Sequence, residues 1–89
     1  MIVERFRNGA AAPVYRRFRE RGRQIPEGLI FVDSWVSADL TRCYQIMDCE
    51  DRRLLDEWMS YWADLVDFEV VPVISSAEAA ALVLAEEES

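Results

Sequence analysis

Residues 28–48 read GLIFVDSWVSADLTRCYQIMD and lie between two segments with helical patterns. Within this stretch, residues 29–36 and 42–47 are rich in β-branched, aromatic and other apolar side chains, and the polar residues 37–39 separate them. Short runs of this composition around a polar turn are typical of two antiparallel strands that pair as a hairpin. The hairpin is the predicted centre of the fold.

Strict alternation divides the first strand of the hairpin into two faces. One face carries Leu29, Phe31, Asp33 and Trp35, and the other carries Ile30, Val32, Ser34 and Val36. Because both faces are largely apolar, we expect this strand to be covered on both sides. Asp33 departs from the pattern, since an acid within an apolar strand must be hydrogen-bonded or must reach a cavity.

Two elements are predicted before the hairpin. Residues 1–6 mix apolar and charged side chains and predict a first strand that ends before a turn at Asn8-Gly9. Residues 13–21 predict a short helix, because Pro13 suits a first helical turn and Gly22 suits a helix end. This helix carries four of the ten arginines of the chain.

An amphipathic helix is predicted directly after the hairpin, with Asp48 or Glu50 as its cap. Its apolar residues recur at three- and four-residue steps and are Leu54, Leu55, Trp58, Met59, Trp62 and Leu65. This is the clearest helical pattern in the chain.

A fourth strand is predicted over residues 70–74, with Pro72 near an edge or at a strand end. Ser75 and Glu78 then have the spacing of a capping box and open a third helix that ends near Ala85. Residues 86–89 are expected to form a frayed acidic tail, because negative charge is unfavourable at the carboxyl end of a helix.

The predicted order is β-α-β-β-α-β with an extra C-terminal helix. It indicates an α+β fold of the ferredoxin-like class, in which one antiparallel sheet carries both long helices on one face. All of residues 1–89 are expected to form a single domain. The other face of the sheet is left open and apolar, so we expect a homodimer formed through that sheet face.

Composition narrows the possible partners. The net charge is −7, every basic residue is Arg, and no Lys or His is present. Through Arg23 seven arginines stand against two acids, and afterwards three arginines stand against fifteen acids, which gives +5 and −12. RNA-recognition domains share the predicted element order, but a net negative chain repels phosphate and residues 42–48 lack the glycine and repeated aromatics of their motif. No nucleic acid partner is expected.

No membrane segment, metal or cofactor is predicted either. The chain has no apolar run near the roughly 20 residues that span a bilayer, which favours a cytoplasmic protein. Cys43 and Cys49 lie six residues apart, without a CxxC motif or a His to complete a ligand set. Both are expected to be reduced, partly buried thiols.

The chain resembles an uncharacterised bacterial family, domain of unknown function 3303, which is itself similar to the dimeric α+β barrel group. The resemblance covers nearly the whole chain and rests on the runs VYRRFRERGR, IPEGL, VDSWVS, RCYQIMDCED, DEWMSYWADLVDFEVVPV and SSAEAA. It implies a dimeric α+β barrel with a cleft between helices and sheet. In different members of that group this cleft hosts cofactor-free oxygenation, isomerisation or lyase chemistry, or binds a small molecule. Enzymes of the group often use a cleft His, which this chain lacks, so no catalytic pattern carries over.

The candidate site residues are few. Asp33 and Tyr44 are the main candidates for a general acid or base, with Glu4 as a third. For Asp33 the alternative is a buried acid paired with Arg42 or Arg23. Since Tyr44 and Gln45 point to opposite faces of their strand, at most one of them can enter a given cleft.

Trp35, Trp58 and Trp62 are candidates for the walls of a ligand pocket, with Gln45 and Arg42 as polar ligand-binding groups. Packing in the core is the alternative role for each tryptophan.

Two interpretations of function remain open. In the first, the dimer binds a small hydrophobic or aromatic metabolite in a cleft between helices and sheet, and cofactor-free monooxygenase or isomerase-like chemistry is a further step. Whether the chain is an enzyme is left open. In the second, it is a non-catalytic structural or regulatory dimerisation module without a pocket, whose contacts fall on the Arg-rich first helix or the acidic tail.

Overall fold

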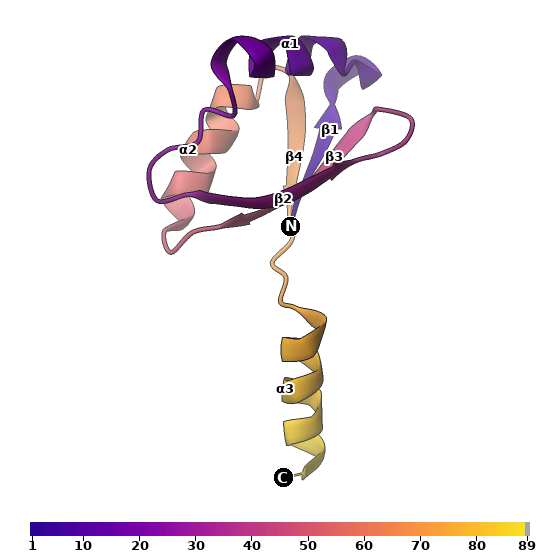
Figure 1. Ribbon diagram of the computed structural model, residues 1–89, viewed down its shortest axis with the longest axis vertical. Helices are drawn as coiled ribbons and strands as arrows, with labels where there is room; N and C mark the ends of the chain where they lie inside the picture. Colours follow the sequence, from indigo (N-terminus) through magenta and orange to yellow (C-terminus); the bar gives the residue numbers. More distant parts are fainter. Residues whose placement is uncertain (89) are drawn as a thin grey trace.

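The computed structural model describes residues 1–88, and its four strands form one antiparallel sheet (Figure 1). The elements are β1 (Ile2–Phe6), the 3-10 turn η1 (Arg7–Gly9), α1 (Ala12–Arg21), β2 (Ile30–Val36), β3 (Arg42–Asp48), α2 (Arg52–Trp62), β4 (Val66–Val70) and α3 (Ser76–Glu88). The strand order is β2-β3-β1-β4. The predicted α+β class and antiparallel sheet are confirmed, and the strand order is compatible with a ferredoxin-like fold.

β1 lies between β3 and β4, and its alternation defines the covered face of the sheet. Ile2, Glu4 and Phe6 are buried on that face, whereas Arg5 is exposed on the other. Ile2 pairs with Gln45 of β3 on one side and with Val70 of β4 on the other. The residues of β3 and β4 that pair with Ile2 and Glu4 therefore face the covered side as well, and they are Cys43, Gln45, Phe68 and Val70.

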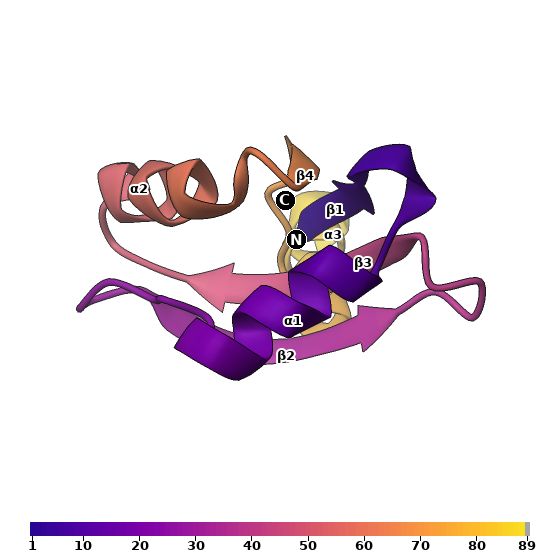
Figure 2. The same cartoon turned by 90° about the horizontal axis from the view of Figure 1, so that it is seen from above.

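α1 and α2 cover this same face. α2 buries three residues at helical spacing, Leu55, Trp58 and Trp62, as its amphipathic pattern predicted. α1 buries no residue fully, although Val14 packs against the core cluster. Seen from above, α1 crosses the body and α2 lies to one side of it (Figure 2). The space between the less deeply packed α1 and the sheet is where a pocket forms.

A β-bulge changes the two faces of β2. Phe31 pairs with Met47 of β3, and the next paired residue is Asp33, opposite Ile46, so Val32 is the extra residue. Phe31 therefore shares the covered face with Ser34 and Val36, whereas strict alternation had grouped it with Asp33 and Trp35. The predicted division of β2 into faces was wrong at its N-terminal end because one inserted residue reverses the parity.

The fourth strand lies four residues earlier than predicted. β4 spans Val66–Val70 and alternates strictly, with Val66, Phe68 and Val70 turned inward and Asp67 and Glu69 exposed. Residues 71–75 form no strand. Pro72 has no backbone donor for a ladder, and the apolar run around it offers no polar face, so the charged alternation was the better strand signal.

Two helix ends also differ from the prediction. The cap of α2 is Asp51, whose carboxylate accepts a hydrogen bond from the backbone N–H of Arg53 at 2.9 Å, and neither Asp48 nor Glu50 has this role. The predicted capping box of α3 is present, since the backbone N–H of Glu78 donates to Ser75 Oγ at 3.1 Å. α3 continues to Glu88, three residues beyond the predicted end near Ala85, and Ala and Glu both have high helix propensity. Ser89, the last residue of the predicted tail, lies outside the described residues.

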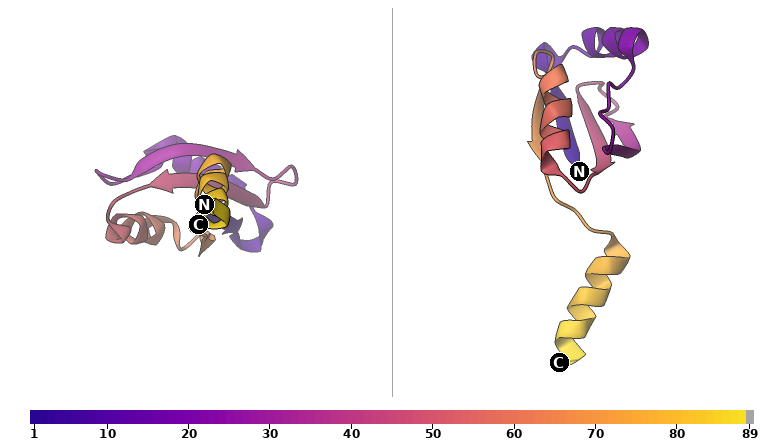
Figure 3. Two further views of the ribbon diagram at one scale, coloured as in Figure 1. Left: turned by 90° about the horizontal axis from the view of Figure 1, so that it is seen from below. Right: turned by 90° about the vertical axis from the view of Figure 1, so that its left-hand side faces the viewer.

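α3 stands apart from the rest of the structure. Figures 1 and 3 show it at the far end of the molecule from α1, joined to β4 by an extended linker. The backbones of Met1 and Val71 exchange two hydrogen bonds, of 2.6 and 2.8 Å, and these mark where the chain leaves the sheet. The molecule is elongated as a result, with principal extents of 52 × 31 × 17 Å.

Candidate functional site

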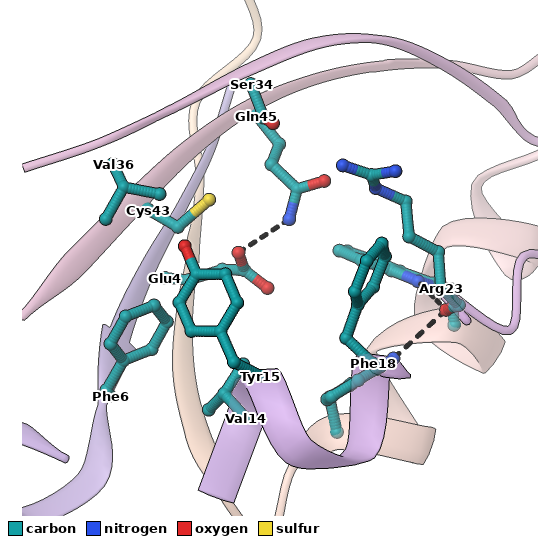
Figure 4. A pocket seen from close by; sticks show the side chains of 12 residues that line it. Glu4, Phe6, Val14, Tyr15, Phe18, Arg23, Ser34, Val36, Cys43 and Gln45 are labelled. Carbon is teal, nitrogen blue, oxygen red and sulfur yellow. Dashed lines mark hydrogen bonds between the residues drawn. The ribbon is translucent and has the colours of Figure 1, made fainter. Parts of the chain in front are cut away.

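A pocket of about 110 Å³ lies between α1, α2 and the covered face of the sheet (Figure 4). Its lining residues come from three layers of the fold. The sheet contributes Glu4, Phe6, Ser34, Val36, Cys43 and Gln45, α1 contributes Val14, Tyr15 and Phe18, α2 contributes Trp58 and Trp62, and the α1–β2 connection contributes Arg23. Tyr15 and Phe18 remain exposed to solvent, so the pocket opens along α1.

α1 is held over the pocket by an arginine on its surface. Arg17 Nη1 and Nη2 donate to the two carboxylate oxygens of Asp64, at 2.7 and 2.6 Å, and Nη1 also donates to the carbonyl of Tyr61 at 3.1 Å. This bidentate pair joins the middle of α1 to the end of α2. It also holds the pKa of the Asp64 carboxyl well below its usual range, at about 2.

Both tryptophans of α2 fix the connection that follows α1. The indole N–H groups of Trp58 and Trp62 donate to the same acceptor, the backbone carbonyl of Arg23, at 3.0 and 3.1 Å. The guanidinium of Arg23 then lies over the ring of Phe31, 3.8 Å from its centroid, and 5.1 Å from the centroid of Phe18. Buried indoles need a hydrogen-bond acceptor, and here that need places a cation at the pocket wall.

The floor of the pocket is polar. Gln45 Nε2 donates to Glu4 Oε2 at 2.6 Å, and Figure 4 shows the Gln45 amide turned into the pocket toward Glu4. Glu4 and Gln45 are only 5% and 6% exposed. Buried polar groups of this kind are rare unless their hydrogen bonds are satisfied or they serve a ligand.

Burial dominates the acid–base properties of the floor. It raises the pKa of Glu4, an effect opposed by hydrogen bonds from Gln45 and Cys43 and by the positive charge of Arg23. Burial, together with the adjacent Glu4, raises the pKa of the Cys43 thiol to about 12. Cys43 is therefore an unreactive thiol near neutral pH. Burial also raises the pKa of Tyr15.

One atom of the floor lacks a partner. Gln45 Oε1 is buried and accepts no hydrogen bond from any of the described residues. An amide oxygen in this state loses the hydrogen bonds it would make to water, which costs about 1–3 kcal/mol. A donor that enters the pocket would recover this cost.

The family of this chain is recognised from nearly its whole length and not from the pocket residues alone. The model of a family described as Domain of unknown function (DUF3303) matches residues 1–87. The chain belongs to this family. No curated protein and no solved structure matches it. Membership in DUF3303 confirms the family resemblance seen in the sequence, but the family description names no activity, so the function must be argued from the site.

The structure divides the predicted site residues between two faces of the sheet. Trp58, Trp62 and Gln45 line the pocket. Trp35 and Tyr44 pair across β2 and β3 on the open face, where Trp35 is 53% exposed. The three tryptophans therefore do not share one pocket, and Tyr44 is not at the polar end of the pocket found here.

Asp33 and Arg42 also lie outside the pocket. Asp33 is exposed and its carboxylate accepts a hydrogen bond from the backbone N–H of Ser34 at 2.8 Å. The alternative in which Asp33 is a buried acid paired with Arg42 or Arg23 was wrong, because the bulge leaves Asp33 on the open face of an edge strand. The buried acid of this fold is Glu4.

Several pocket residues were missed in the sequence. Tyr15 and Phe18 were not among the candidate site residues, and Arg23 was considered only as a partner of Asp33. Glu4 was named as a third acid, yet its parity with Ile2 and Phe6 was a usable signal, since it places a carboxylate on the covered face.

The described residues hold no group of His, Cys, Asp and Glu side chains that could bind a metal ion. Both cysteines are free thiols. Among residues 1–88, no helix is long and apolar enough to cross a membrane.

Proposed function

We propose that this DUF3303 chain binds a small aromatic molecule that carries at least one N–H or O–H group. The observation on which this proposal rests is the buried, unpartnered Oε1 of Gln45 on the floor of the pocket. Since Gln45 Nε2 already donates to Glu4, the amide cannot turn over without losing that bond, and Oε1 stays an acceptor. The ligand must then supply the donor.

The pocket walls indicate the rest of the ligand. Tyr15, Phe18, Trp58 and Trp62 present aromatic surface, and ligand pockets of this kind combine apolar walls with a few polar groups. Its volume of about 110 Å³ is somewhat below the 150 Å³ of an apolar cavity that binds benzene. We therefore expect a ligand no larger than one ring with a hydroxyl or amino group, part of which would lie in the opening along α1.

Glu4 is the group through which proton transfer would occur if the chain is an enzyme. A carboxyl whose pKa is raised by burial can hold a proton closer to neutral pH than an exposed carboxyl does. This property supports cofactor-free proton transfer as an extension of binding, with Glu4 in the role first considered for Asp33 and Tyr44.

Calorimetric titration with phenol and with toluene tests the binding proposal, because the two ligands have similar rings and only phenol has a donor. We expect phenol to bind about tenfold more tightly than toluene, the difference of one hydrogen bond to a buried acceptor. Gln45→Met should remove the preference for phenol over toluene, and Phe18→Ala should weaken the binding of both ligands. Asp33→Asn, on the opposite face, is the matched control. Equal affinity of the unmodified protein for phenol and toluene would contradict the proposal.

We also propose that two copies associate through the open face of the sheet. That face carries a group of apolar side chains, which are Val3, Ile30, Trp35, Tyr44 and Ile46. A neighbouring sheet would remove Trp35 and Ile30 from water, which is favourable by roughly 25 cal/mol per Å² of apolar surface.

Sedimentation at micromolar concentration tests this association. We expect a dimer for the unmodified chain and a shift toward monomer for Trp35→Asp. Leu40→Asp, at an exposed residue in the hairpin turn, is the control. A 10.3 kDa species for the unmodified chain would exclude the dimer.

A further inference from the structure

The C-terminal arm, defined here as residues 71–88, is rich in apolar residues of the kind that are usually buried. These apolar side chains are nevertheless exposed to solvent. Val73, Ile74, Leu82, Val83 and Leu84 are each more than half exposed. α3 shows almost no separation of apolar and polar faces over its length. Exposed apolar side chains in such number mark an interaction surface.

The linker directs the arm away from its own body. Residues 71–75 read VPVIS, with a proline and three β-branched residues and no glycine. Pro72 fixes its own φ and disfavours helical or turn geometry at Val71, and β-branched residues resist positive φ. A sharp reversal within these five residues would require such geometry. The arm is thus presented outward, away from its own body, as Figure 3 shows.

Charge complementarity identifies the surface that the arm fits. The arm contains four glutamates and no basic residue. On α1, Arg16, Arg19 and Arg21 are exposed and form no ion pair with any described residue. A shallow hollow in the same helix is lined by Ala12, Tyr15, Arg16 and Arg19, at i, i+3, i+4 and i+7. An apolar side chain flanked by carboxylates matches this hollow flanked by arginines.

The matching surfaces lie at opposite ends of one chain (Figure 1). A two-fold axis perpendicular to the long axis brings the arm end of one copy beside the α1 end of the other, and the two contacts are then identical. We infer that the arm of one copy packs on α1 of a second copy, in a reciprocal exchange. On α3, Ala79, Val83 and Glu87 recur every four residues and would form one stripe of this contact.

A charge-swap experiment with the full chain tests the exchange. The arm variant carries Glu86→Arg and Glu87→Arg, and the helix variant carries Arg16→Glu and Arg19→Glu. In the arm variant alone the two introduced arginines face the arginines of α1 and the net charge of the arm falls from −4 to 0, and in the helix variant alone the introduced glutamates face the glutamates of the arm, so we expect the dissociation constant of the dimer to rise about tenfold or more at low salt. In an equimolar mixture of the two variants the introduced arginines of one chain face the introduced glutamates of the other, and the unmodified arm faces the unmodified α1. The mixture should therefore associate as tightly as the unmodified protein.

A different result is expected if the net charge of the chain alone governs association. The two arm substitutions add four positive charges and change the net charge from −7 to −3, which reduces general repulsion between copies. If general repulsion governs association, the arm variant associates more tightly than the unmodified chain. That outcome overturns the proposal. The proposal is also overturned if the arm variant and the helix variant each associate as tightly by themselves as the unmodified chain does.

A docking of the arm on its own α1 is also distinguished. Each variant would then associate more weakly than the unmodified chain, both alone and in the mixture. One chain carrying all four substitutions would regain the association of the unmodified chain. Recovery in the mixture also shows that each variant is folded. Because none of these measurements involves a pocket ligand, their failure leaves the binding proposal untouched, and the reverse also holds.

Discussion

Glu4 is the residue whose environment differs most from that of an ordinary surface acid. Its pKa is raised by burial above 4.5, so the folded chain holds a proton over a pH range in which the unfolded chain has released it. The contribution of Glu4 to stability is fully present below its pKa in the unfolded chain. It is lost as pH rises through the raised pKa of Glu4 in the folded chain.

We therefore expect the free energy of unfolding to fall as pH rises from about 4.5 through the pKa of folded Glu4. Glu4→Gln should remove this slope, and urea denaturation at a series of pH values measures it. Glu69→Gln, which changes an exposed acid on β4, should leave the slope in place. Parallel pH profiles for the unmodified protein and Glu4→Gln would show that Glu4 is ionised in the folded chain.

Gly28, at the start of the hairpin stretch, is required for two separate reasons. Its φ of +93° is unfavourable for other residues, and an added Cβ would lie 2.9 Å from Leu54 Cδ1. We expect Gly28→Ala to lower the free energy of unfolding by about 2 kcal/mol or more. Gly22→Ala is the matched control, since Gly22 has φ +69° and no heavy atom within 4 Å of the added Cβ. Equal losses for both variants would mean that the contact with Leu54 has no cost.

At the scale of elements, α1 depends on a polar attachment more than on burial. It has no fully buried residue, and Arg17 links it to the end of α2 through the Asp64 carboxylate and the Tyr61 carbonyl. We expect Asp64→Asn to increase amide exchange in α1 at neutral pH while the strands keep their protection. Arg52→Gln, which breaks the exposed Arg52–Asp56 pair within α2, should not change exchange in α1.

The Arg17–Asp64 pair also determines the acidic pH at which α1 loses its attachment. The pKa of Asp64 is lowered from 3.8 to about 2, so the attachment is present above 3.8 and is lost as pH falls through about 2. An NMR titration in which α1 resonances shift near pH 4 instead of near pH 2 would indicate that the pair is not formed in solution.

The elements also show what local patterns can and cannot predict. α2 was predicted from its apolar spacing alone, since Leu55, Trp58 and Trp62 match the helical period and are all buried. The bulge at Val32 could not be predicted, because the number of residues on one strand depends on its pairing with another. Val70 to Ile74 satisfied strand propensity, but the position of β4 is set by its pairing with β1, which sequence order does not reveal.

The candidate site was predictable only in part for a similar reason. Trp58, Trp62 and Gln45 were recognised by residue type, and the pocket contains all three. Arg23 reaches the pocket because two indoles bind its backbone carbonyl, a contact between residues 35 and 39 positions apart. Side-chain chemistry is visible in a sequence, whereas convergence of distant residues is visible only in the fold.

At the scale of the whole molecule, the body and the arm are distinct. The radius of gyration is 15.7 Å, compared with about 12 Å for a compact chain of this length, and the extended arm accounts for the difference. The core cluster lies within residues 2–70.

We therefore expect a chain that ends at Ser75 to remain folded. Under dilute conditions its free energy of unfolding should differ from that of the full chain by less than about 0.5 kcal/mol. Its radius of gyration by small-angle X-ray scattering should fall to about 11 Å. Loss of a cooperative unfolding transition in the shortened chain would show that the arm belongs to the folded core.

The division of the tryptophans between the two sheet faces has a spectroscopic consequence. Trp58 and Trp62 are 2% and 3% exposed beside the pocket, and Trp35 is 53% exposed on the open face. Iodide, a quencher confined to water, would reach the fluorescence of Trp35 and leave the blue-shifted emission of the other two. Filling of the pocket and covering of the open face would then give separate optical signals from one unlabelled sample.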